Sequence, residues 1–160
     1  MVLIFSILVV TGSAFAGNLR VDTVIVEIKG TVTDARFVPA VVKVQPGDVI
    51  QFEVREGLHT VTAYHPENRR PLRIPKAATP FDSGLLKPGE IWFLSIDAEG
   101  VYDYFCLPHE RMGHVGRIFS GSVEGIPAYP ADQIPDKALK KIDSLTIGFN
   151  KTILINPKRK

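Results

Sequence analysis

Residues 102–114 read YDYFCLPHERMGH, and this stretch carries most of the information about the fold and chemistry of the chain. It contains the only cysteine, Cys106, which is followed by His109 and His114. Tyr102, Tyr104 and Cys106 occupy alternate positions, so their side chains share one face if this segment is a strand. If the tyrosines face a core, the thiol also faces it, at the end of the strand and beneath the following loop.

The donor atoms in and near this stretch indicate a metal site. A thiolate and neutral imidazoles, with a thioether nearby, suit copper better than a hard cation. A further candidate, His59, lies far upstream in GLHTV at 57–61. Pro108 stiffens the turn between Cys106 and His109, so a short loop can wrap one ion. His65 would lie roughly 20 Å from His59 in an extended chain, and we interpret it as a loop histidine.

Outward from this stretch, the chain predicts short strands separated by turns. Runs rich in β-branched or alternating apolar residues occur at 24–28, 37–44, 49–54, 91–96, 101–106 and 116–123. Before residue 130 no segment has a convincing helical period. This spacing predicts an all-β domain, an antiparallel sandwich or barrel. The length of 160 residues suits one domain.

The two ends of the chain differ from this middle part. Residues 1–16 carry no charge and end in Ala-Phe-Ala, which predicts a secretory signal peptide, although no basic residue precedes the apolar run. A buried N-terminal strand is the alternative. The apolar run is shorter than the roughly 20 residues of a membrane span, so we expect a periplasmic or secreted protein without a stable span after processing. A lone cysteine in an exported protein forms no internal disulfide, which favours a ligand role.

Residues 125–160 are expected to form a C-terminal extension of a domain at 17–124. Three prolines punctuate its first part, and 135–142 predicts a short helix with Pro135 near its first position. Residues 146–155 predict one more strand. The extension is either a strap packed on the domain or a flexible tail.

The segment 63–87 is long and rich in proline, and it carries Arg69, Arg70, Arg73 and Lys76. Long loops in compact domains are usually functional or disordered. Two interpretations remain open: a solvated basic loop, or a docking surface for an acidic partner with Arg69 and Arg70 as contacts. The net charge of +2 gives no case for binding nucleic acid.

Four segments in order resemble the cupredoxin, or blue-copper, family, and most of all its plastocyanin, pseudoazurin and halocyanin-like members. The resemblance covers about residues 30–123. The segments are FxPxxVxVxxGDxIxF at 37–52, GLHTV at 57–61, FDSG with a following PG at 81–89, and YxYxCxPH with later glycines and GRI at 102–118. The resemblance implies an eight-stranded Greek-key β-sandwich that holds one copper ion, with His59, Cys106 and His109 as its trigonal ligands.

One position departs from the family pattern. In these relatives a weak axial methionine lies eight residues after the cysteine, where this chain has His114; Met112 lies two residues earlier. We expect His114 to be the axial ligand, with Met112 or water as the alternative. An imidazole is a harder and stronger donor than a thioether, so it should favour Cu(II). The site should then be more tetragonal, green or red in colour, and lower in potential.

The resemblance implies a carrier of single electrons between extracytoplasmic redox partners, rather than an enzyme. His109 would be the exit for the electron, with Pro108 and Met112 as an apolar contact patch around it. The alternatives are a copper enzyme acting on nitrite or nitric oxide, and a copper storage or delivery protein. Two methionines in the chain are few for a delivery site. Glu110 is close enough to His109 to influence a bound ligand, but we interpret it as a surface residue.

Two other chemistries use the same residue types. Zinc also accepts Cys and His ligands in tetrahedral sites. A Cys/His hydrolase needs an exposed and activated thiolate, which a core-facing cysteine beside two tyrosines fits poorly.

Overall fold

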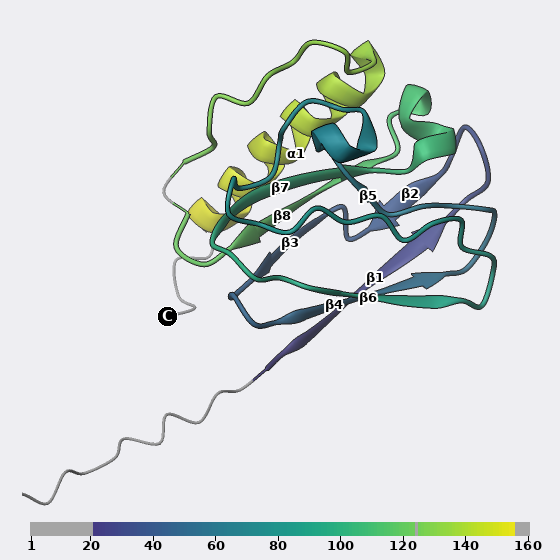
Figure 1. Ribbon diagram of the computed structural model, residues 1–160, viewed down its shortest axis with the longest axis horizontal. Coiled ribbons are helices and arrows are strands. Elements are labelled where there is room, and N and C mark those ends of the chain that lie inside the picture. The colour runs from purple at the N-terminus through teal and green to yellow at the C-terminus, as the bar shows by residue number, and fades with distance from the viewer. Residues whose placement is uncertain (1–20, 124, 156–160) are drawn as a thin grey trace, which may run out of the picture.

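The computed structural model describes residues 21–123 and 125–155, so the expected signal peptide at 1–16 lies outside the described residues. Two β-sheets pack face to face, and a long helix covers one of them (Figure 1). The strands are β1 (Thr23–Lys29), β2 (Arg36–Val38), β3 (Val41–Val44), β4 (Val49–Val54), β5 (Thr62–Ala63), β6 (Ile91–Ser95), β7 (Gly100–Phe105) and β8 (Val115–Ser120). The helices are the 3-10 turns η1 (Pro66–Asn68) and η2 (Leu107–Met112) and the α-helix α1 (Asp136–Ile155).

The first sheet has the order β2-β1-β4-β6 and the second β3-β8-β7-β5. The predicted β-sandwich is therefore confirmed. The sheets are not purely antiparallel, however, because β1 pairs with β4 and β3 with β8 in parallel. Parallel neighbours need a crossover connection, and local patterns along each strand carry no information about such a crossover.

The core between the sheets follows the alternation expected from the sequence. Ile50, Phe52 and Val54 on β4 are buried, while the residues between them are partly exposed. On β7, Tyr102 and Tyr104 belong to the same buried cluster as Cys106, which confirms that the thiol faces the core. The remaining residues from Val101 to Phe105 are buried as well. β7 is thus covered on both faces.

The second cover on β7 and β8 is α1, which lies across their outer face (Figure 1). Ala138 and Ile142 lie four residues apart on one face of α1 and are buried against Tyr64 and Phe105, together with Ile134 just before the helix. The expected strand at 146–155 is wrong, because the helix continues to Ile155. β-branched residues in this segment favour a strand locally. The first helical turns of α1 are packed on the sheet, however, and the helix continues from them.

Among the described residues, no helix has both the length and the apolar character required to cross a bilayer. The topology instead gathers several loops at one end of the sandwich. η2 joins the end of β7 to the start of β8, and His59 lies between β4 and β5, where it forms a β-bridge with Leu86.

Candidate metal centre

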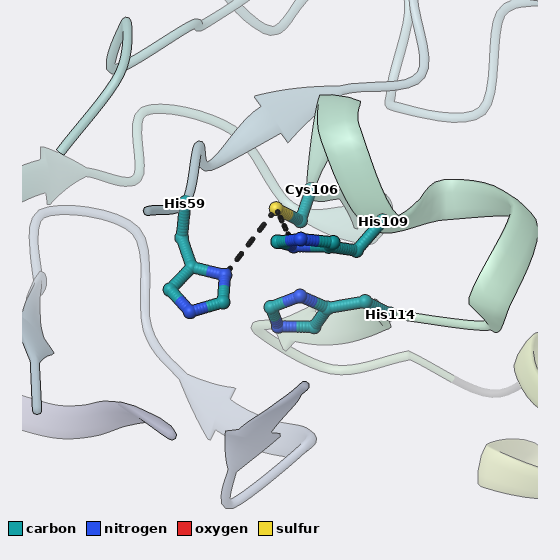
Figure 2. A group of neighbouring side chains, drawn as sticks. All are labelled: His59, Cys106, His109 and His114. Atoms are coloured by element: carbon teal, nitrogen blue, oxygen red, sulfur yellow. Dashed lines mark hydrogen bonds between the residues drawn. The ribbon is translucent and has the colours of Figure 1, made fainter. Parts of the chain in front are cut away.

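Four buried side chains converge at this end of the sandwich: His59, Cys106, His109 and His114 (Figure 2). One ligand atom from each lies within 4.8 Å of the others. The Cys106 Sγ is 3.3 Å from Nδ1 of His109 and 3.6 Å from Nδ1 of His59. The structure therefore brings together all four residues that the sequence singled out as candidate ligands.

The backbone of η2 places three of these residues. The amide of His109 donates to the carbonyl of Cys106 at 3.0 Å, and the amide of Cys106 donates to the carbonyl of His114 at 3.0 Å. Pro108 lies in the first turn of η2, where its fixed φ suits a helical start. Gly113 ends the turn with φ of 86°, a left-handed conformation that glycine adopts without strain. The loop thus returns to the site with His114 facing Cys106.

His59 is oriented by two backbone carbonyls. Its Nε2 lies 3.0 Å from the carbonyl oxygen of Gly30 and 2.8 Å from that of Glu56. Because both neighbours are acceptors, Nε2 carries the proton and donates. The lone pair is then on Nδ1, the atom that faces Cys106. Metal-binding histidines are generally oriented in this way by the second ring nitrogen.

Burial raises the pKa of the Cys106 thiol to about 11, and a hydrogen bond from the backbone amide of Thr60, at 3.4 Å, acts in the opposite direction. The thiol alone is therefore protonated at neutral pH. A bound cation reverses this preference, because a coordinating thiol loses its proton. A nucleophilic cysteine needs exposure and a lowered pKa, so the geometry is unsuited to a Cys/His hydrolase.

His114 is the least satisfied member of the group. It is 1% exposed, and neither ring nitrogen has a hydrogen-bond partner among the described residues. Burial, with smaller contributions from His59 and His109, lowers the pKa of His114 to about 2, so the ring is neutral with a free lone pair. A buried polar atom without a partner costs about 1–3 kcal/mol. A metal ion bound to the ring nitrogen that carries the lone pair would remove that cost for this nitrogen, so the donor set fits the group that the sequence implies.

Two other sequence candidates lie outside this group. Met112 is 44% exposed at the end of η2 and lines a groove beside α1. His65 precedes η1, and its Nδ1 accepts a hydrogen bond from the amide of Glu67 at 3.2 Å. The interpretation of His65 as a loop histidine agrees with this position.

Glu110 is buried, which corrects its interpretation as a surface residue. Arg70 binds its carboxylate through two nitrogens, with Nη2 at 2.6 Å from Oε2 and Nε at 3.1 Å from both oxygens. The guanidinium also lies 5.3 Å from the centre of the Phe105 ring. Arg70, in the segment between β5 and β6, thus neutralises the carboxylate of Glu110, which follows His109 in sequence.

The basic loop is therefore neither simply solvated nor wholly available for docking. Arg70 is engaged by Glu110, and Arg73 is buried and donates to Asp103 at 2.8 Å. Arg69 and Lys76 remain exposed. Glu110 and Asp103 lie 40 and 30 residues from their arginine partners in sequence, so no local pattern predicts these pairs.

An apolar hollow of about 410 Å³ opens beside His109. Pro108, one of the two predicted contact residues, lines this hollow, and the sequence reasoning missed its other apolar residues: Val32, Leu58 and Leu85. All three are half exposed. Apolar residues inside turn segments, one of them adjacent to His59, were the available signal.

Phe37 is another residue with a missed role. Its ring centre lies 4.1 Å from that of His114 and 4.7 Å from that of Tyr104. The sequence placed Phe37 in an early strand, but its contact with His114 depends on how β2 meets the loop before β8.

Comparisons with known proteins agree with this geometry. Residues 24–120 match the family described as copper binding proteins, plastocyanin/azurin family. Pseudoazurin of Paracoccus pantotrophus is 32% identical over 109 residues, covering 68% of this chain and 69% of the relative. Plastocyanin of Vicia faba is 34% identical over 83 residues, 51% of this chain and 84% of the relative. The similar match to plastocyanin of Pisum sativum spans 49% of that relative.

Among solved structures, a pseudoazurin from Sinorhizobium superposes with a TM-score of 0.58 at 25% identity, covering 76% of this chain and 91% of the other. The family match covers more than half of the sequence, and the four convergent donors all lie within the matched residues. The chain therefore belongs to the plastocyanin/azurin family of copper-binding cupredoxins.

Proposed function

We propose that the protein binds one copper ion through His59, Cys106 and His109, with His114 as the axial fourth ligand, and carries single electrons between extracytoplasmic partners. The observation that carries this proposal is the convergence of four buried donor atoms, one of which has no other partner. Copper, when bound, supplies a one-electron couple. Thiolate and imidazole donors also suit zinc, and the match to a family of copper binding proteins favours copper as the native ion.

The surroundings of the ligands support a carrier role. His59 is held by two carbonyls, and Cys106 receives the Thr60 amide, so these donors are positioned by the fold rather than by the ion. A site that is already arranged changes little between two oxidation states. The apolar hollow lets a partner approach His109 closely, and the electron would leave through this residue. Redox partners that separate quickly use small interfaces of this kind.

The alternative functions have less support. Glu110 is the acid nearest to His109, and its ion pair with Arg70 leaves it poorly placed to assist a reaction on nitrite or nitric oxide. The ligand side chains are almost fully buried, whereas a delivery protein needs a site that a recipient can reach. We therefore infer an electron carrier rather than an enzyme or a copper store.

The test is the Cys106→Ser variant, with the exposed neighbour change Leu107→Ala as its control. Removing the thiolate should abolish the sulfur-to-copper absorption of the loaded protein and its reversible voltammetric wave. Leu107→Ala should keep both. If Cys106→Ser retains its colour and its wave, the proposed copper site is wrong. If the wild type binds copper but shows no reversible wave, the carrier role is wrong.

A further inference from the structure

A second hollow lies beside the metal centre, next to the ligand loop. It has a volume of about 540 Å³ and lies between residues 33–37, the end of η2 and α1. We call it the basic groove, because its charged lining residues are Arg36, Lys137, Lys140 and Lys141 with a single acid, Asp34. Its net lining charge is strongly positive, although the whole chain carries only +2.

The positive charge of the basic groove is largely uncompensated. Asp34 lies 3.8 Å from Arg36 and pairs with it. The three lysines are exposed, and none of them forms an ion pair with another described residue. Lys137 is three and four residues from Lys140 and Lys141, spacings that bring like charges together on one helical face and disfavour the free helix. An anionic occupant would relieve this repulsion.

The basic groove adjoins the site from which an electron would leave. Val32 lines the apolar hollow and Thr33 lines the basic groove, so one loop separates the two. η2 also borders both, with His109 in the apolar hollow and Met112 in the groove. Phe37, in the lining of the groove, contacts the ring of His114 at 4.1 Å between centres. One bound protein can therefore cover both surfaces.

We propose that the basic groove binds an acidic segment of the redox partner, so that the partner's carboxylates lie along α1 while its apolar surface covers His109. The identity of the occupant as a redox partner rests on the proposed function. Charge complementarity of this kind accelerates association and sets orientation, and salt weakens it. The lysines of α1 lie in the predicted C-terminal extension. In this proposal they, rather than Arg70, supply the charges that bind the partner.

The test compares two variants that change net charge equally. Lys137→Glu/Lys140→Glu reverses the groove, and Lys43→Glu/Lys76→Glu reverses two exposed lysines near the opposite end of the sandwich, where β7 begins. The probe is a hexaglutamate peptide at low ionic strength, titrated by calorimetry and by amide NMR shifts. The groove variant should bind at least tenfold more weakly, and the control should stay within twofold of the wild type. Shifts should centre on Met112, Gly113 and α1.

The proposal is overturned by no binding of the peptide to the wild type, by equal losses in both variants, or by shifts that map away from the groove. Binding to phosphatidylserine vesicles without binding to the peptide also overturns it, because the occupant is then a membrane surface. The copper absorption of the groove variant should equal that of the wild type. Peptide binding is measured on metal-free protein as well, so a failure of the copper site and a failure of the groove are seen separately.

Discussion

At the scale of single residues, the proposed axial ligand His114 is the residue expected to set the character of the copper site. It lies eight residues after Cys106, and its buried ring nitrogens have no partner among the described residues. Phe37 packs against the ring of His114 and limits the other orientations that this ring can adopt. An axial donor is one of the means by which a protein sets the potential of a copper site.

His114→Met should therefore shift the site toward a blue spectrum and raise its potential. Each tenfold change in the preference for one oxidation state is 59 mV for one electron, so we expect a rise of about 60–120 mV. Optical and paramagnetic resonance spectra with voltammetry measure both effects. His65→Met, which changes a histidine outside the cluster, is the control. Unaltered copper hyperfine splitting and optical bands in His114→Met would exclude axial ligation by His114.

The ion pair between Arg70 and Glu110 is the second feature at this scale, and it bears on the stability of the fold. Glu110 is 3% exposed at its side chain and Arg70 is 26% exposed. Removal of one partner leaves a buried charge unpaired, which costs about 3–5 kcal/mol for a fully buried pair. Partial solvation of Arg70 lowers the expected loss for Arg70→Met to about 2–3 kcal/mol, below the range for a fully buried pair.

Urea unfolding of the metal-free protein measures this loss. Arg36→Met is the matched control, because its partner Asp34 is exposed, and such pairs contribute about 1 kcal/mol or less. If Arg70→Met is no more destabilising than Arg36→Met, the ion pair does not hold η2 in place.

At the scale of elements, α1 is the structural feature that most changes the sandwich. It packs on β8 and on Phe105 of β7, and it contacts η2, the turn that carries His109. The backbone of Lys137 approaches Gly113 so closely that an added Cβ would lie 3.3 Å from its carbonyl oxygen. The extension therefore both buries the sheet and bounds the ligand loop.

Ile142→Ala should destabilise the metal-free protein by about 2–5 kcal/mol, because Ile142 is fully buried against the second core cluster. Denaturant unfolding monitored by circular dichroism measures it. Asp143→Ala changes the neighbouring exposed position and should stay within about 0.5 kcal/mol. A loss as small as that of the control would mean that α1 contributes little to the stability of the fold.

At the scale of the whole molecule, metal binding and folding are coupled, because the four donors come together only in the folded chain. His59 is 47 residues from Cys106, so the unfolded chain presents no equivalent site. A ligand that binds only the folded state stabilises it by about 2.7 kcal/mol when its concentration is 100 times Kd.

Copper loading at that excess should raise the Tm by about 5–11 °C for a chain of this length. Calorimetry before and after addition of a chelator measures the change, and Cys106→Ser should abolish most of it. A Tm that responds equally to copper in the variant would show that the ion binds elsewhere.

Much of this protein follows from local sequence. The alternation through Tyr102, Tyr104 and Cys106 placed the thiol in the core, and the short spacing to His109 and His114 placed three donors in one loop. These inferences succeed because strand period and loop length are properties of neighbouring residues. The turn and strand signals likewise predicted a sandwich or barrel, and the family resemblance implied the sandwich.

Only the tertiary structure decided what lies next to what across long separations. It pairs Glu110 with Arg70, makes β1 and β4 parallel neighbours, and extends α1 through a segment with local strand preference. It also assembles the basic groove from residues about 100 positions apart. The physical reason is that burial, ion pairing and helix packing depend on which distant surfaces meet, and a pattern of adjacent residues does not contain that information.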